Sequence, residues 1–543
     1  MRPHAAGSGE HLTALCAGAL AFTLLLVCGL LLLLAVNGLS HFWPRRLVQL
    51  ELRDGRRLLG ELQQRETAPP AEPGAPPQWR VQLKVGNRDV GGADFVWVDE
   101  AGIARRDEPA DVVELERLEW GNFYGRMVEL RRGDERLASG PEAAWRAFPL
   151  LHAAKQREAR EVAALEKGPI GEINHQIDRL TLARREPRLA RLPQRERSER
   201  LQQLDEQITE RREEYERLAE RLATLRRELL RETAVMEAAD GTRKEVPVAA
   251  IVRAFRPNAL GWPERVRLYA GRLWEFVAGE PRESNTEGGI LPAIFGTVMM
   301  VFITGIAVTP LGVLAAVYLR EYARQGPFVR IVRIAVNNLA GVPSIVFGMV
   351  GLGFFVYFLG GTIDRLFYPE RLPNPTFGTG GILWASLTLA VLTVPVVIVA
   401  AEEGLAAVPR VVREGSMALG ATKFETTWRI VVPAAAPGIL TGMILAMARA
   451  AGEVAPLMIV GMVKLAPNLP LDHHAPFVHL ERKFMHLGFH IYDIGFQSPN
   501  VEASKPLVFA TALLLVLVVA VMNLAAIALR NHLRRRYALA ADV

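Results

Sequence analysis

The sequence predicts a polytopic α-helical membrane protein with six transmembrane helices and one large external α+β insertion. Half of its 543 residues are hydrophobic, and they are concentrated in long runs. A bilayer core of about 30 Å needs about 20 apolar residues as a helix. Six stretches meet or approach that length, at about 12–36, 290–319, 334–359, 380–401, 437–463 and 506–529. Because backbone polar groups must be paired inside lipid, we expect each stretch to be helical.

Residues 1–36 are expected to form a cytoplasmic N-terminus and the first transmembrane helix. The apolar run of about 24 residues is longer than the core of a usual signal peptide, and no A-x-A cleavage site follows it, so we interpret it as a retained anchor. Cys16 and Cys28, the only cysteines, would lie about 18 Å apart along this helix. That separation is too large for a disulfide, and we expect both to act as plain hydrophobic residues.

The placement of Lys and Arg predicts the orientation of the chain in the membrane. Basic side chains occur in the loop after the second span, in the loop after the fourth span and in the C-terminal tail: Arg320, Arg324, Arg330, Arg333, Arg410, Arg413, Lys423, Arg429, Arg530, Arg534, Arg535 and Arg536. We therefore expect a multi-pass protein of the bacterial inner (plasma) membrane with both termini in the cytoplasm. The region 37–285 would then be periplasmic.

The predicted periplasmic insertion, 37–285, has three parts. Residues 46–135 contain short alternating runs such as LVQLELRDG, WRVQLKVGN, DFVWVDE and MVELRRGD, which predict a β-rich unit. Residues 151–232 predict helix, and the return segment 233–285 is expected to complete the β unit and lead back to the membrane.

The helical part of the insertion has heptad spacing in its second half. Apolar positions fall at steps of three and four, at Leu201, Leu204, Ile208, Tyr215, Leu218, Leu222, Leu225 and Leu229. Pro187 and Pro193 would interrupt the helix between its first and second halves. The simplest interpretation is an antiparallel, coiled-coil-like hairpin that folds back at 187–193. A single solvated helix and a coiled coil between two molecules remain alternatives.

The fifth span contains an ionised pair, Arg449 and Glu453, in the stretch ILAMARAAGEVAPL. The two residues are four apart, so we expect them on one helix face. Charged residues inside a span are costly and usually face a pore, a substrate or each other, and Arg can bind an oxyanion through two hydrogen bonds. A substrate pathway at this pair is the functional interpretation, and a buried pair that fixes helix packing is the alternative.

Weaker pathway candidates lie in the second and third spans. Gly341 and Pro343 interrupt an apolar helix just before Ser344, and the start of a broken helix offers free N–H groups to an anion. An ordinary proline kink is the alternative. Thr297 and Thr309 in the second span are further candidates for the substrate pathway.

Five histidines between residues 473 and 490 resemble a metal site only at first sight: His473, His474, His479, His486 and His490. They lack the Cys or carboxylate spacing of a structural zinc site. We expect no metal here and an external loop lying on the membrane surface. The chain also has no G-x-x-x-x-G-K-[ST] sequence and no nucleophile motif, so it is expected to be no enzyme itself and to hold no cofactor. Any ATP would be bound by a partner ATPase.

A polar segment between the fourth and fifth spans carries the most specific pattern in the chain. Small, acidic and helix-breaking residues stand at fixed offsets, at Glu414, Gly415, Ser416, Gly420, Ile430 and Pro433. This spacing resembles the EAA loop of ABC-importer permeases at every offset, with Gly415 and Ser416 in place of the usual alanines. The resemblance implies a cytoplasmic helix–turn–helix within 402–433 that docks onto the ATP-binding subunit.

Further stretches resemble the phosphate-import permeases of the PstA family. They are GGILPAIFGT at 288–297, NNLAGVPSIVFG at 337–348, ARAAGEVAPL at 448–457 and YDIGFQSPN at 492–500. The resemblance covers about 285–530 and implies the six-helix fold of ABC-importer permeases, with a permease core at 286–543. Arg449 and Glu453 match charged positions associated with phosphate passage. Val399 stands where related permeases can carry an Arg, and the long insertion is typical of a longer-chain subgroup.

The resemblance implies a permease subunit of an ATP-driven phosphate importer. Its expected partners are a second, PstC-like permease, a PstB-like ATPase dimer and a PstS-like periplasmic phosphate-binding protein, in lipid and without nucleic acid. Sulfate or molybdate is an alternative cargo. An envelope scaffold or sensor is an alternative of another class, although a scaffold requires neither six spans nor the segment from Glu414 to Pro433.

Overall fold

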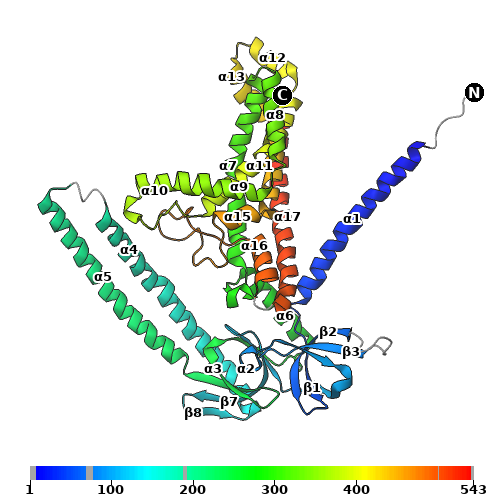
Figure 1. Cartoon of the computed structure of the whole chain (residues 1–543), viewed down its shortest axis with the longest axis vertical. Helices are drawn as coiled ribbons and strands as arrows, with labels where there is room; N and C mark the ends of the chain where they lie inside the picture. The colour runs from blue at the N-terminus through cyan, green and yellow to red at the C-terminus, as the bar shows by residue number, and fades with distance from the viewer. Residues whose placement is uncertain (1–7, 69–77, 187–191, 499–500, 540–543) are drawn as a thin grey trace, which may run out of the picture.

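The computed structural model describes residues 8–68, 78–186, 192–498 and 501–539. Within that range six helical segments are long and apolar enough to cross a membrane: Thr13–Ser40, Leu291–Tyr322, Ser344–Phe367, Ile382–Ala407, Lys423–Gly452 and Val501–His532. Figure 1 shows a helical bundle with an α+β unit at one end. The predicted polytopic helical fold with an extra β-containing region is confirmed.

The third and fifth spans differ from the prediction because a proline breaks each of them. Helix α8 (Pro327–Leu339) ends four residues before Pro343, and α14 (Val432–Gly452) ends four residues before Pro456. A proline ring clashes with the carbonyl four residues earlier in a continuous helix. The third span therefore begins at Ser344 and runs through α9 (Ser344–Val350), a π-helical stretch (Gly351–Gly360) and α10 (Gly361–Phe367). The fifth is followed by the short α15 (Ala455–Val460).

Four helices lie side by side along the long axis of the bundle (Figure 1): α7 (Leu291–Val317), α11 (Ile382–Ala407), α14 and α17 (Val501–Leu539). Glycines allow α11 and α14 to approach closely, since a Cβ at Gly438 would lie 2.6 Å from the Cα of Gly404. The α9–α10 segment crosses this axis, and α1 (Ser8–Ser40) leans away from the bundle. Both therefore present apolar surface that this single chain leaves uncovered.

The α+β unit contains two antiparallel sheets. The first has the order β4-β3-β2-β1-β5 and the second β10-β9-β7-β6-β11, with β8 paired to β7. The first sheet comprises β1 (Leu47–Leu52), β2 (Arg57–Ala68), β3 (Gln78–Lys84), β4 (Phe95–Asp99) and β5 (Ile103–Asp107). The second comprises β6 (Val113–Arg117), β7 (Phe123–Arg132), β8 (Glu135–Ser139), β9 (Glu232–Glu237), β10 (Arg243–Pro247) and β11 (Ile251–Phe255). The return segment thus supplies the second sheet with three strands.

The helical hairpin begins earlier than the pattern predicts. Helix α3 (Pro141–Leu165) continues through a π turn (Glu166–Ile170) into α4 (Gly171–Arg185), and α5 (Gln194–Leu229) returns alongside them (Figure 1). The side chains of Val162, Ile170 and Leu222 form the centre of the shared apolar seam. The hairpin arrangement is present, while most of its predicted turn, 187–191, lies outside the described residues.

The insertion joins the bundle through α6 (Trp262–Ala278) and a small two-stranded ribbon of β12 (Pro281–Arg282) and β13 (Glu287–Gly288). Near this junction a short helix, α2 (Arg88–Gly91), follows the first three strands. Arg272 of α6 lies 2.9 Å from Glu114 and 2.6 Å from Glu116, both on β6. The guanidinium thus ties the helix that leads to the membrane to the centre of the second sheet.

Glu287 at this junction predicts a pH dependence of stability. Burial and the nearby Glu283 carboxylate raise the pKa of Glu287 from 4.5 to about 7. The folded state therefore holds this proton more tightly than the unfolded chain, and stability should fall as the pH rises from 4.5 to about 7. Between pH 5 and pH 8, we expect the wild-type Tm in detergent to fall by about 2–4 °C more than that of Glu287→Gln. Equal pH slopes for the two proteins would contradict this assignment.

Candidate functional site

The segment between α11 and α14 forms a compact helical hairpin at the end of the bundle opposite the α+β unit (Figure 1). It consists of α12 (Arg410–Ala418) and α13 (Lys423–Thr426), and a π turn (Thr427–Val431) leads into α14. We call α12, α13 and the residues between them the docking hairpin. The helix–turn–helix implied by the sequence resemblance is therefore present.

Gly420 makes the turn of the docking hairpin. Its φ of 90° lies in the left-handed region, which a side chain makes costly and glycine adopts freely. Its N–H donates to the Met417 carbonyl at 3.0 Å and so closes the end of α12. Two residues on, Thr422 caps the start of α13, and its hydroxyl accepts from the backbone N–H of Glu425.

The predicted small residues of α12 have different surroundings. The Ser416 hydroxyl is buried and lies 2.9 Å from the Thr426 hydroxyl, which joins the two helices of the docking hairpin. Glu414 is exposed, and a Cβ at Gly415 would meet no atom within 4 Å. Ile430 is exposed at the π turn and Pro433 begins α14. Glu414 and Gly415 thus present an open face, whereas Ser416 holds the hairpin together.

Large apolar side chains project from the docking hairpin into the surroundings. Leu419 is 92 % exposed, Val411 77 % and Phe424 64 %. Large apolar side chains exposed within one short polar segment are typical of a protein-interaction site. The hairpin therefore has the surface that docking to another subunit requires.

A partly buried ion pair, which no sequence pattern indicates, anchors the docking hairpin to the bundle. Arg413 lies 2.9 Å from Glu321. Glu321 belongs to a π turn, Tyr318–Tyr322, that follows α7. Arg413 also donates to the Leu405 carbonyl at 2.7 Å. Glu321 and Arg413 stand 92 positions apart, and no local pattern links them. The pair provides a direct mechanical connection between the hairpin and α7.

Removing this anchor should loosen the docking hairpin. Deleting one partner of this partly buried pair leaves the other charge without compensation, at a cost below the about 3–5 kcal/mol of a fully buried pair. We expect Arg413→Ala to increase amide hydrogen exchange across α12 by at least about tenfold. The control is Arg410→Ala, an exposed residue of the same helix, which should leave exchange unchanged. Equal protection in both variants would show that the pair does not hold the hairpin.

Arg449 and Glu453 lie at the end of α14. The Nε atom of Arg449 is 3.5 Å from Oε1 of Glu453, and the side chains are 36 % and 22 % exposed. They do not share a helix face as predicted, because α14 ends at Gly452 and Glu453 has an extended backbone. Neighbouring Ala450 is buried against the bundle. Arg449 therefore lies on the side of α14 that this chain leaves partly open.

Within the described residues, no hydrogen bond or ion pair joins Thr297 or Ser344, the other two pathway candidates, to this pair. Thr297 is buried, and its hydroxyl donates to the Ala293 carbonyl at 2.7 Å and accepts from the Leu487 N–H at 2.9 Å. Ser344 is half-buried at the start of α9, and no hydrogen bond within the described part of the chain joins it to Arg449. Their pathway roles remain predictions, with Thr297 engaged in packing α7 against α16.

The prediction that the histidine segment lies on the membrane surface is wrong for three of its members. His479, His486 and His490 are buried, because the segment folds back and places α16 (Leu487–Tyr492) against α7 and α17. Burial lowers the pKa of His486 and of His490 to about 4. A π turn (Asp493–Gln497) follows, and Asp493 lies 3.1 Å from Lys464. The apolar residues between the histidines, such as Leu487 and Phe489, were the available signal for burial.

Comparison with known proteins places the membrane core in a family. Residues 308–539 match the family described as "Binding-protein-dependent transport system inner membrane component". The phosphate transport system permease protein PstA 1 of Mycobacterium tuberculosis (strain CDC 1551 / Oshkosh) is 35 % identical over 250 residues, which cover 46 % of this chain and 73 % of that protein. The probable ABC transporter permease protein YqgH of Bacillus subtilis is 32 % identical over 194 residues, so the chain spans 59 % of its length.

Among solved structures, an inward-facing MetNI methionine ABC transporter resembles the chain only loosely. The TM-score is 0.33 at 19 % identity, covering 44 % of this chain and 94 % of that one. The family assignment therefore rests on the sequence matches.

Proposed function

Because this chain belongs to the binding-protein-dependent transport system inner membrane components, and among them to the PstA-like permeases, we propose that it is a permease subunit of an ATP-driven inorganic phosphate importer. The PstA name of several relatives supports phosphate as the cargo. The observation that carries the proposal is the docking hairpin, whose turn, cap and exposed apolar side chains match what coupling to an external ATPase demands.

In this proposal the docking hairpin binds a separate, PstB-like ATPase. Leu419, Val411 and Phe424 would enter a groove of that subunit, and Glu414 would remain free to form a charged contact. The Arg413–Glu321 pair would transmit the movement of the ATPase to the end of α7. The chain would thus contribute no ATP site of its own and would convert ATPase closure into helix movement.

Phosphate would pass along the partly open face of α14. Arg449 has guanidinium N–H groups available beyond its single 3.5 Å contact with Glu453, and guanidinium binds phosphate oxygens through paired hydrogen bonds. A second, PstC-like permease would cover this face and the apolar surfaces of α1 and α9–α10. A PstS-like binding protein would deliver phosphate from the opposite side of the membrane.

The proposed topology places the docking hairpin and both termini in the cytoplasm and the α+β unit in the periplasm. Two features support it: the basic loops predicted to be cytoplasmic include the docking hairpin, and the α+β unit lies at the other end of the bundle (Figure 1). The insertion would be positioned to contact the binding protein or the second permease.

The test is identification of the partners of the tagged full-length chain after mild solubilisation of host membranes. We expect an ATPase with a P-loop and a second permease at stoichiometric levels. Recovery of envelope proteins alone, with neither an ATPase nor a second permease, would favour a scaffold or sensor and contradict the proposal.

A further inference from the structure

A charged cavity of about 480 Å³ lies where the α+β unit meets the bundle. Its walls come from the end of α1, the start of α17, strands β2, β3 and β6, helix α6 and the ribbon segment. The first and last candidate spans, Thr13–Ser40 and Val501–His532, end and begin at this wall. The cavity is therefore at the level of lipid headgroups, on the side of the membrane that carries the insertion.

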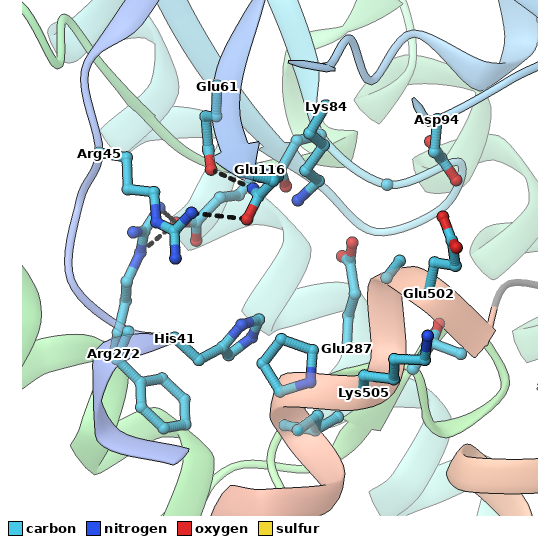
Figure 2. Close-up of a pocket in the computed structure, with 18 of the residues that line it drawn as sticks. His41, Arg45, Glu61, Lys84, Asp94, Glu116, Arg272, Glu287, Glu502 and Lys505 are labelled. Carbon is cyan, nitrogen blue, oxygen red and sulfur yellow. Dashed lines mark hydrogen bonds and ion pairs between the residues drawn. The ribbon is translucent and has the colours of Figure 1, made fainter. Parts of the chain in front are cut away.

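Side chains of both charges face this cavity without direct protein partners (Figure 2). Lys84 and Glu287 point toward the same space, and within the described residues neither side chain has a hydrogen bond or an ion pair. Arg45 also lines the cavity, but its guanidinium donates only to neutral oxygens, those of Gln63 at 2.6 Å and of the Leu62 carbonyl at 3.3 Å. Among the described residues the cavity thus offers one cation, Lys84, and one carboxylate, Glu287, that have no partner, and a second cation, Arg45, that has no charged partner.

The remaining wall shows that this arrangement is unusual for a buried region. Glu114 is buried with one carboxylate oxygen that has no hydrogen-bond partner among the described residues. Burial also raises the pKa of Glu287, as described above, although the cation Lys84 acts in the opposite direction. Buried polar groups such as Glu114 are normally paired, and Lys84, Arg45 and Glu287 are half-buried beside it, so a ligand carrying both a cation and an anion would satisfy groups that the chain leaves open.

An apolar groove adjoins the cavity along the membrane-facing side of α1. Ala35, Val36 and Leu39 line it, and it shares Ser40, Trp43 and Arg45 with the cavity. Tyr269 of α6 also lines it beside Trp43, with ring centroids 5.6 Å apart. Aromatic side chains at this depth are typical of the membrane–water interface. A pocket that carries charges of both signs thus continues into an apolar groove at the level of the bilayer.

We propose that this junction binds one zwitterionic phospholipid of the phosphatidylethanolamine class from the leaflet on the insertion's side. Its phosphate would contact Arg45 and Lys84, its ammonium group Glu287, and an acyl chain would occupy the groove along α1. The lipid would fasten the α+β unit to the membrane at the point where α1 and α17 meet. Free inorganic phosphate shares the phosphate chemistry, but it offers neither the ammonium group nor the chain that the groove accommodates.

The test is native mass spectrometry of the purified full-length chain, titrated with phosphatidylethanolamine or phosphatidylglycerol of identical acyl chains. We expect one phosphatidylethanolamine per chain, with at least about tenfold higher occupancy than phosphatidylglycerol. The double variant Arg45→Gln/Lys84→Gln should lower this occupancy at least about tenfold. The control is Arg53→Gln/Lys483→Gln, whose residues are exposed in the described chain and do not line the cavity; it should bind as the wild type does.

Two further measurements separate the sources of the phosphate group. Glu287→Gln should keep lipid binding but reduce the preference for phosphatidylethanolamine to below about threefold, because the ammonium group loses its carboxylate. Equilibrium dialysis of the delipidated chain with labelled inorganic phosphate should show no binding that depends on Lys84. Equal binding of the two lipids by the wild type, or Lys84-dependent binding of inorganic phosphate without lipid binding, would overturn the proposal. If the double variant does not fold, the Arg45→Gln single variant must lower occupancy at least about threefold.

Discussion

Arg449→Ala should lower phosphate uptake by about 10- to 150-fold without reducing the amount of assembled complex. Hydrogen bonds from a charged donor are worth about 1.5–3 kcal/mol, and each 1.36 kcal/mol corresponds to about a tenfold change in rate. Arg449 is partly exposed, and its contact with Glu453 is stretched to 3.5 Å, so its removal should cost little folding energy. Uptake of labelled phosphate by cells that express the variant, normalised to complex in the membrane, measures the effect.

The control for Arg449 is Arg324→Ala, an exposed arginine in the loop after α7, outside both α14 and the docking segment. We expect it to transport normally. Arg449→Lys keeps the charge but loses the paired N–H geometry, and its uptake should lie between those of the wild type and the alanine variant. Normal uptake by Arg449→Ala, or loss of the whole complex in that variant, would indicate that the pair serves helix packing instead.

Gly420→Val should reduce co-purification of the ATPase at least about tenfold. The φ of 90° at Gly420 is in the left-handed region, which costs about 1–2 kcal/mol for an ordinary residue and more for a β-branched one. No atom lies within 4 Å of a Cβ built there, so the effect would come from the backbone alone. The turn would open, and α13 would no longer lie against α12. Quantitative pull-down of the tagged chain gives the ratio of ATPase to permease.

Gly415→Ala is the matched control for the turn glycine. Gly415 lies inside α12, where a Cβ meets open space, and alanine stabilises a helix interior relative to glycine. Its ATPase ratio should equal that of the wild type. An unchanged ratio in Gly420→Val as well would show that the turn is not required for docking.

The docking hairpin could be predicted from sequence because its determinants are local. Gly420 must adopt a positive φ, Thr422 and Glu425 cap the next helix, and all of them lie within a few positions of one another. The length and apolarity of the six spans are local properties too, and the strands of the insertion follow from alternation over five to seven residues. Each of these features can be recognised without knowing what packs against it.

Features that depend on distant partners could not be predicted in the same way. Arg413 meets Glu321 across 92 positions, and a sequence pattern gives no reason to pair them. The burial of His486 and His490 depends on α16 folding back against α7 and α17. The break before Ser344 was indicated by Gly341 and Pro343, with an ordinary proline kink as the alternative. The break before Glu453 was within reach, since Pro456 fixes where α14 ends, but the apolar pattern on both sides of it concealed it.

Reconstitution shows whether this chain is a membrane subunit of an ATP-driven phosphate importer. The chain and the partners that co-purify with it are placed in liposomes with ATP supplied on the side of the docking hairpin. The phosphate-binding protein is supplied on the side of the insertion, and accumulation of labelled phosphate, sulfate and molybdate is measured. We expect ATP-dependent uptake of phosphate in at least about tenfold excess over the other two anions. Uptake of sulfate or molybdate in preference, or no ATP-dependent uptake of any of the three, would contradict it.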